Sequence, residues 1–185
     1  MRLPPIPQSE WSDAQRDVAG AIVSGPRGEV RGPFVPLLYS PGLAARVQAL
    51  GEYVRFGSDI PDPLLEIAIL MTARKLECAH IWQSHSRLAQ NAGVGADVIA
   101  ALSRRDLPAG GNDGVDTVAR FCRELLETNR VGDAAFESVV ARWGRKGAME
   151  LTGTCGYYGL LAMVLNVADN PLEPGAVPFA AAPQR

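Results

Sequence analysis

Apolar residues recur at helical spacing in successive segments of the chain, and glycines and prolines collect between those segments and near both ends. Apolar positions three or four residues apart line one face of a helix, whereas a half-buried strand alternates at every second position. No convincing alternating run occurs in the sequence. The pattern therefore predicts an all-α fold, with helices over residues 14–24, 41–56, 63–75, 79–92, 94–106 and 115–129, from residue 133, and over 148–168.

Signals at the ends of these segments agree with the predicted helices. Ser12 and Gln15 have the spacing of a capping box, while Ser40 and Asp62 each precede a proline at the first helical position. Residues 25–36 form a predicted loop that is rich in glycine. No strand pattern precedes this loop and no Lys-Ser/Thr pair follows it, so the loop is not predicted to bind phosphate.

Two predicted helices share a short pattern, an acid flanked by apolar residues near the helix start, at Glu66 and at Glu150. This similarity predicts a helical bundle with two pseudo-repeated halves, which a linker at residues 108–113 separates. The last helix also carries glycines at every third position, which predicts a stripe for close helix packing: Gly153, Gly156 and Gly159.

The chain is predicted to be one domain, residues 1–185, with proline-rich arms at residues 1–10 and 171–185. Its 18 basic and 20 acidic residues give a net charge of −2, which argues against nucleic acid and anionic membranes as partners. The longest apolar run, residues 157–168, contains an asparagine and is shorter than the roughly 20 residues that cross a bilayer. Three cysteines and no signal-peptide core predict a reduced, cytoplasmic protein.

Both histidines of the chain, His80 and His85, lie within eight residues of Cys78. In a helix over this segment, Cys78, Trp82 and His85 share the face that meets the preceding helix, and His80 points elsewhere. The preceding helix is almost entirely apolar and carries Glu66 near its start. A carboxylate buried there without a partner would cost on the order of several kcal/mol, so it needs a donor, and an imidazole is the nearest candidate.

This cluster has two interpretations. In the first, Glu66, His85 and Cys78 form a proton relay, because burial raises the pKa of a carboxyl group, an imidazole titrates near neutral pH and a helix start favours a thiolate. In the second, the residues are structural: Glu66 caps its helix or pairs with Arg74, His85 is a hydrogen-bonded core residue and Cys78 packs as a small apolar side chain. The sequence leaves both interpretations open.

The remaining cysteine and histidine patterns predict no further chemistry. The spacing of Cys78, His80 and His85 lacks the paired ligands of structural zinc sites, so no metal site is predicted. Cys122 and Cys155 each lie on an apolar helical face. Both are therefore expected to be core residues rather than nucleophiles.

One segment, residues 65–94, has the pattern of a known helix pair. Its matching residues are 65–70 (LEIAIL), 73–74 (AR), Cys78, Trp82, His85, 88–89 (LA) and 92–94 (AGV). Over these residues the chain resembles the carboxymuconolactone decarboxylase family, which includes the alkyl hydroperoxidase D proteins. A looser likeness extends over most of the chain, through Gly-Pro-Phe, Ser-Pro, Arg-Phe-Gly and Gly-Tyr-Tyr segments. The resemblance implies an alkyl hydroperoxidase D-like helical bundle and a homo-oligomer, commonly a dimer, trimer or hexamer.

The resemblance also implies two kinds of chemistry. In the hydroperoxidase branch, a Cys-x-His-Cys-x-x-x-His motif and an upstream glutamate form a thiol pair with a proton relay. Glu66, Cys78, His80 and His85 occupy four of those positions, but Ile81 replaces the second cysteine, so a disulfide cycle between these positions is impossible. The decarboxylase branch uses a histidine and cations, without a cysteine pair or a cofactor, to remove a carboxylate from a lactone acid.

We therefore expect a cofactor-independent lyase or isomerase that acts on a small unsaturated carboxylate or lactone from aromatic catabolism. In this hypothesis His85 is the general acid/base, Glu66 orients it or relays its proton, and Trp82 forms the pocket wall. Arg55 or Arg74 would bind the substrate carboxylate. Arg55, at the end of an apolar helix, is the better candidate.

Two alternative functions remain open. A one-cysteine alkyl hydroperoxidase or thiol peroxidase would use Cys78, activated by His80 or His85, and an outside thiol would resolve the oxidised product. A non-catalytic oligomer that binds a small ligand would keep the fold without the reaction, because a shared fold does not ensure a shared activity.

Overall fold

The computed structural model describes residues 1–108, 113–169 and 172, and within these residues it contains helices and no strand. The all-α prediction is confirmed. A 3₁₀ turn, Gln8–Glu10, precedes the first α-helix. The α-helices are α1 (Asp13–Ser24), α2 (Phe34–Leu37), α3 (Pro41–Phe56), α4 (Asp62–Lys75), α5 (Ala79–Asn91), α6 (Ala96–Ser103), α7 (Asp113–Thr128) and α8 (Asp133–Ala168).

The sequence pattern located the helices that build the centre of the fold. The predicted segments 41–56, 63–75 and 79–92 agree with α3, α4 and α5 to within one residue. Ser12 forms the predicted capping box with Gln15 at the start of α1. The predicted loop at residues 25–36 differs from the structure at its end, where the short helix α2 begins.

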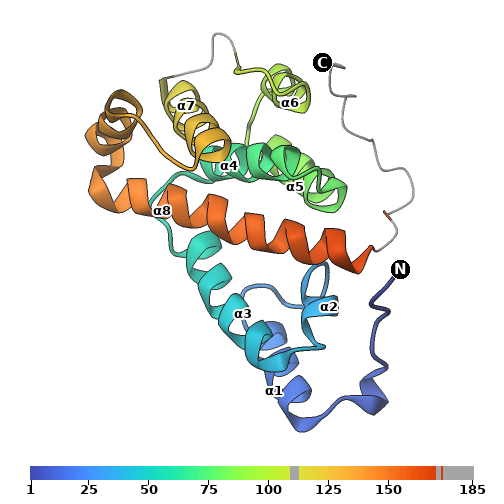
Figure 1. Cartoon of the computed structure of the whole chain (residues 1–185). Coiled ribbons are helices and arrows are strands. Elements are labelled where there is room, and N and C mark those ends of the chain that lie inside the picture. The colour runs from blue at the N-terminus through green and yellow to red at the C-terminus, as the bar shows by residue number, and fades with distance from the viewer. Residues whose placement is uncertain (109–112, 170–171, 173–185) are drawn as a thin grey trace.

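Helix α4 is the central helix of the bundle. Helices α5, α7 and α8 pack around it, and α6 also contacts it. In Figure 1, α4–α7 lie on one side of the long helix α8, and α1–α3 lie on the other. Ile67, Ala68, Leu70 and Ala73 on α4 are completely buried. A helix that is apolar on every side must be surrounded by other helices, and this gives Glu66 a buried setting.

Helix α8 is kinked at Gly144, where φ is 66° and ψ is −177°. Glycine adopts this backbone conformation without the strain that a side chain would add. The two arms of α8 on either side of the kink correspond to the predicted helices from residue 133 and over 148–168. Among the described residues, α8 is the one helix long and apolar enough to cross a membrane, and 56% of its most apolar window is buried inside the protein.

The predicted stripe of close-packing glycines on α8 is wrong in part. A Cβ atom at Gly159 would meet Leu76 Cδ1 at 3.7 Å, so this glycine lies against the end of α4. A Cβ atom at Gly153 or Gly156 would find no atom within 4 Å. Because an α-helix turns once in 3.6 residues, positions at steps of three drift around its axis and do not share one neighbour.

The N-terminal residues lie over the end of α8. The backbone N–H of Arg2 donates to the carbonyl of Ala168 at 2.8 Å, and the hydroxyl of Tyr39 donates to the carbonyl of Pro4 at 2.9 Å. Residues 109–112 of the predicted linker lie outside the described residues, as does the predicted C-terminal arm except for Leu172.

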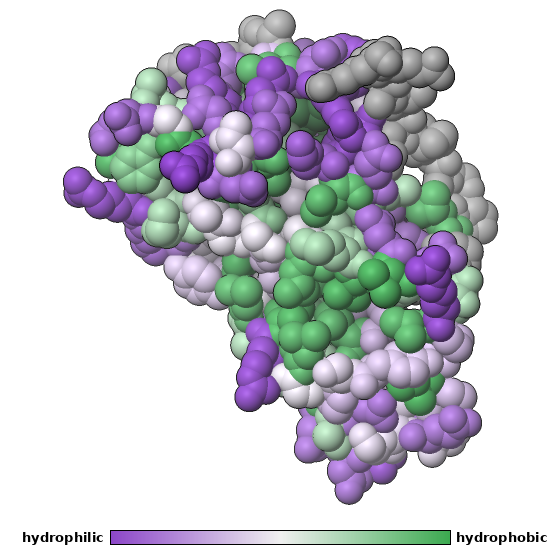
Figure 2. All heavy atoms as spheres, in the orientation of Figure 1, coloured by the Kyte–Doolittle hydropathy of each residue, from purple (hydrophilic) through white to green (hydrophobic). Residues whose placement is uncertain are grey.

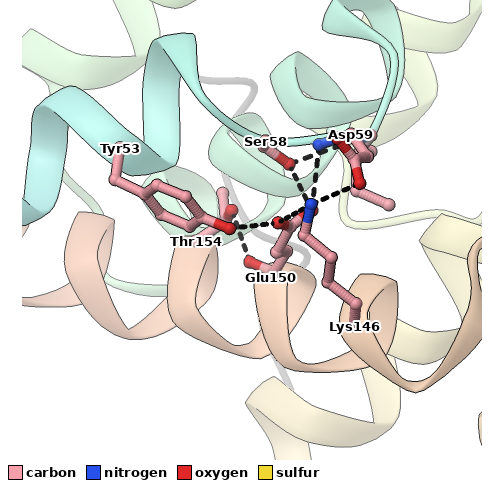
Figure 3. A network of polar contacts seen from close by, with 7 residues as sticks. Tyr53, Ser58, Asp59, Lys146, Glu150 and Thr154 are labelled. Carbon is pink, nitrogen blue, oxygen red and sulfur yellow. Dashed lines mark hydrogen bonds and ion pairs between the residues drawn. The ribbon is translucent and has the colours of Figure 1, made fainter.

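A buried carboxylate, Glu150 on α8, holds the connection between α3 and α4 against α8 (Figure 3). Its oxygens accept hydrogen bonds from the hydroxyl of Tyr53 at 2.6 Å, the hydroxyl of Ser58 at 2.9 Å and the backbone N–H of Asp59 at 3.0 Å. Lys146 lies 3.5 Å from Glu150 and also pairs with Asp59. Burial opposes ionisation of Glu150, but the hydrogen bonds outweigh it and hold the pKa of this carboxyl below its usual value.

Replacing Glu150 with glutamine is expected to destabilise the protein by about 2 kcal/mol near neutral pH, because an amide cannot accept all three hydrogen bonds. The depressed pKa fixes the pH dependence: the stabilisation is complete above the usual pKa of a glutamate and is lost as the pH falls through the lower folded-state value. Urea unfolding of wild type and E150Q should therefore differ near neutral pH and converge in acid. Exposed Glu137 on the same helix supplies the control E137Q, and an equal loss in that variant would contradict the assignment.

Candidate functional site

Glu66 on α4 and His85 on α5 meet in the interior of the bundle. The Oε2 atom of Glu66 lies 2.7 Å from Nδ1 of His85. Only 8% of Glu66 and 6% of His85 is exposed. The carboxylate thus has an imidazole as its buried partner, as the hypothesis of a proton relay requires.

The turn between α4 and α5 brings these two side chains together. Glu77 has a positive φ of 53°, which reverses the chain after α4. The backbone N–H of Cys78 then donates to the carbonyl of Ala73 at 2.9 Å and closes the turn. Because α5 packs directly against α4 after so short a connection, a residue in the first half of α4 faces a residue in the middle of α5.

The surroundings of His85 disfavour its protonated form. Burial lowers the pKa of the imidazole, and the charges of Arg55 and Arg27 lower it further. The hydrogen bond and the charge of Glu66 raise the pKa. Burial is the largest effect, so the pKa of His85 lies below its usual value. Tyr158 on α8 packs edge-on against the imidazole, with ring centroids 5.0 Å apart and an interplanar angle of 84°. The neutral imidazole is therefore favoured over the protonated one, and Tyr158 holds the ring in one orientation.

A cavity of about 170 Å³ lies beside this pair. Its polar wall residues are Arg55, Asp62, Glu66, Thr154 and Tyr158, and the other wall residues are apolar. His85 is not part of the wall, although it contacts two residues that are, Glu66 and Tyr158. The carboxylate of Glu66 is therefore the member of the pair that meets the contents of the cavity.

Arg55, near the end of α3, supplies a positive charge to the cavity wall. Its guanidinium carbon lies 5.6 Å from the centre of the Phe56 ring. Within the described part of the chain, no hydrogen bond or ion pair occupies the guanidinium. No group of three or more His, Cys, Asp or Glu side chains among the described residues could hold a metal ion. Arg55 can bind a carboxylate through two parallel N–H donors.

Arg74 lies away from the cavity, at the other end of α4. Its buried guanidinium donates from Nε to the carbonyl of Ser103 at 2.7 Å, and its Nη1 lies 3.5 Å from Glu77. Burial lowers the pKa of Arg74. These contacts tie the end of α4 to the end of α6, so the structure favours Arg55 over Arg74 as the candidate for carboxylate binding, and it does not pair Arg74 with Glu66.

Cys78, His80 and Trp82 also lie outside the cavity wall. Cys78 is completely buried at the start of α5, and burial raises the pKa of its thiol, which backbone N–H groups of Ile81 and His80 only partly offset. The shift is opposite to the thiolate-favouring one that the sequence suggested, because desolvation outweighs the helix start. The sequence predicted that Trp82 forms the pocket wall. Other residues, among them Tyr158, line the cavity instead, and the indole of Trp82 is buried in the core.

Cys122 on α7 and Cys155 on α8 are buried, as expected of core residues, and they contact each other. Their Sγ atoms are 3.7 Å apart, which is within hydrogen-bond distance for two thiols. This contact raises the pKa of Cys122 well above its usual value and lowers the pKa of Cys155, to which Thr72 also contributes. The sequence did not reveal the pairing, because the two residues are 33 positions apart on different helices.

Several residues around His85 were not found by sequence reasoning. Tyr158 packs on the imidazole, Tyr157 packs edge-on against Tyr158 at 5.3 Å, and Arg27 donates to the hydroxyl of Tyr157 at 3.1 Å. The one available signal was the Gly-Tyr-Tyr segment, since adjacent tyrosines in an apolar helix need buried partners for their hydroxyl groups. Nothing local in the sequence connects Arg27 to this region.

One segment of the chain resembles a known protein family. Residues 41–124 match the sequence model of the Carboxymuconolactone decarboxylase family. A search of curated proteins gives no match. The matched segment runs from α3 into α7 and contains Arg55, Glu66 and His85, whereas Tyr158 lies outside it.

The coupling between Glu66 and His85 can be measured by NMR titration of the imidazole. His85 is expected to titrate below the usual histidine pKa of about 6.5. Glu66→Gln should lower the His85 pKa further, because the carboxylate stabilises the protonated ring and the amide does not. The variant Glu137→Gln, at an exposed residue of α8, is the control and should leave the His85 titration unchanged. A higher His85 pKa in E66Q would contradict the pairing.

Proposed function

We propose that this chain, whose residues 41–124 match the Carboxymuconolactone decarboxylase family, is a cofactor-independent lyase or isomerase. Its substrate is a small unsaturated carboxylate or lactone of the kind formed in aromatic catabolism. The observation that carries the proposal is the Glu66–His85 hydrogen bond beside a cavity with Arg55 in its wall. A buried acid that is hydrogen-bonded to an imidazole can move a proton to or from a substrate, and a nearby cation can hold an anionic substrate in place.

Glu66 and His85 work in series in this proposal. Glu66 is in the cavity wall, and His85 reaches the cavity through Glu66. The carboxyl group would exchange a proton with the substrate, and the imidazole would take up or return that proton through Nδ1. This changes the roles expected from the sequence, in which His85 itself contacts the substrate. His85 becomes the residue that exchanges protons with Glu66.

The size and lining of the cavity support a small substrate with one charged end. A volume of about 170 Å³ corresponds to roughly six water molecules at about 30 Å³ each. Leu65 and Ile69 give an apolar surface for an unsaturated carbon skeleton, while Arg55 provides the partner for a carboxylate. A substrate that fills this space displaces its water, which strengthens the electrostatic interactions inside it.

The proposed steps balance without a redox partner. In decarboxylation, the bond between the carboxylate carbon and the ring breaks, CO₂ leaves, and the electron pair enters the conjugated lactone. Glu66, in its protonated form, then donates a proton to carbon and becomes a carboxylate. His85 takes up a proton from water and passes it to Glu66, so that each turnover consumes one proton from solvent. In isomerisation, the same pair removes a proton from one carbon and returns it to another.

The alternative of a thiol peroxidase receives no support at Cys78. Its thiol is completely buried, its pKa is raised, and it does not line the cavity. A protonated, enclosed thiol is a poor nucleophile toward a hydroperoxide. Cys78 is for this reason left out of the proposed reaction.

Turnover of carboxymuconolactone, followed by CO₂ release, tests the proton-transfer pair. Glu66→Gln and His85→Asn are each expected to lower kcat by roughly 10²- to 10⁴-fold, since each removes general acid/base catalysis. Cys78→Ala is the matched control and should retain turnover. If Glu66→Gln and His85→Asn change only thermal stability while turnover persists, the pair is structural. If wild type lacks this turnover and instead reduces an alkyl hydroperoxide in a reaction that C78A cannot perform, the peroxidase interpretation is supported.

The role of Arg55 predicts a binding defect. Arg55→Met should raise KM roughly tenfold or more and leave kcat less affected, because a charge-assisted hydrogen bond to the substrate is lost. Arg46, exposed on the same helix, provides the control Arg46→Met, which should behave as wild type. An unchanged KM in R55M would remove Arg55 from the proposed site.

A further inference from the structure

We propose that α8 pairs antiparallel with α8 of a second copy of this chain. The proposed contact is a line of residues on the outer face of α8 that we call the α8 seam. It goes beyond the proposed function and does not depend on it. The seam consists of Met149, Gly153, Gly156, Leu160, Met163 and Val167.

The spacing of the seam is that of a helix-pairing surface. Successive seam residues are separated by alternating steps of four and three positions, which keeps them in one line along a helix. The seam contains only apolar residues and glycine over 19 positions, a length of about 27 Å at 1.5 Å per residue. This is the pattern of the contact positions in paired helices, and it lies opposite the face of α8 that is buried in the bundle.

No described part of the chain covers the seam. Met149 is 61% exposed, Leu160 36%, Met163 57% and Val167 59%. The two glycines, Gly153 and Gly156, face open space. A surface helix normally presents polar residues to water on the side away from the core. An apolar outer line on a helix whose inner face is already buried therefore indicates a second packing partner.

The apolar surface continues from the seam onto α3. Leu43, Leu50 and Tyr53 on α3 are each about half exposed. A groove of about 260 Å³ lies between the two helices, and Leu50, Tyr53, Met149 and Gly153 help to line it. Figure 2 shows apolar residues gathered across this face of the molecule. Apolar patches that extend over two helices mark interaction sites more often than single exposed residues do.

The order of large and small residues in the seam favours a second copy as the partner. If two α8 helices run antiparallel about a two-fold axis level with residue 158, Gly153 lies opposite Met163 of the second copy. Gly156 then lies opposite Leu160, and Met149 lies opposite Val167. Each glycine thus provides the space that a large side chain needs, on both sides of the axis. A parallel pair in register would place glycine opposite glycine and leave gaps.

The charges at the ends of the seam agree with the antiparallel order. Arg145 is exposed just before the seam, and Asp169, whose carboxylate lies 3.9 Å from the N-terminal amine of Met1, is exposed just after it. Antiparallel pairing brings the arginine end of one helix to the aspartate end of the other, and parallel pairing brings like charges together. Complementary charges at the rim of an interface guide association and fix its register.

Size-exclusion chromatography with light scattering tests the contact on the full chain at micromolar concentration. Wild type should be a dimer, or an assembly of dimers, based on 19.7 kDa per chain. Leu160→Glu and Met163→Glu should each break this contact and weaken the pairing at least about a hundredfold, because they bury an unpaired charge in it. Val23→Glu, at an exposed apolar residue on α1, is the control and should assemble as wild type. Circular dichroism checks that each variant is folded.

Cysteine cross-linking tests the register independently of any loss of stability. A mixture of the Gly156→Cys and Leu160→Cys proteins should form a disulfide under mild oxidation with oxidised glutathione, and neither protein alone should do so efficiently. The three native cysteines are buried and serve as a background that the wild type measures.

Four results would overturn the proposal, three of them on assembly and cross-linking. Wild type is a monomer; or its assembly survives both glutamate substitutions; or the cross-links form within each single-cysteine protein and not between them. Flotation of the wild type with phosphatidylcholine vesicles, lost in M163E, would identify a lipid surface as the partner instead and would equally overturn it.

Discussion

The hydrogen bond between Glu66 and His85 is the constraint on which the interior of this bundle depends. Helix α4 is apolar on all sides and must be surrounded, yet it carries a carboxylate near its start. Burying that group is tolerable only if a neighbouring helix presents a donor, and α5 does so at 2.7 Å. The same demand orders Tyr158, which holds the imidazole from α8. The need to pair the buried carboxylate of Glu66 therefore accounts both for the packing at the centre of the bundle and for the geometry of the candidate site.

The second buried acid, Glu150, meets the same problem in a different way. Tyr53, Ser58 and the backbone of Asp59 saturate its oxygens with donors, and its pKa falls. An acid in that state remains ionised and holds structure together. Glu66 instead has one imidazole as its hydrogen-bond partner and a cavity beside it. The likeness between the two sequence patterns therefore does not extend to the surroundings of the two carboxylates.

Much of this architecture could be predicted from the chain, because helix periodicity and end signals are local properties. The positions of α3, α4 and α5 follow from them, and the meeting of Glu66 with His85 follows from the cost of burying a carboxylate. The partners of α8 could not be predicted in this way. Tyr158 and Arg27 reach the region around His85 from distant positions, and periodicity says which face of a helix is buried without saying against what. The outward direction of Gly156 escaped prediction for the same reason.

The contact between Cys122 and Cys155 has a consequence for how motion in the core can be observed. The two thiols lie where α7 and α8 pack together, and neither is open to solvent while the helices stay closed. A thiol reagent can reach them only when this interface separates. The rate of their labelling therefore reports local breathing between the two helices, with no probe added to the molecule.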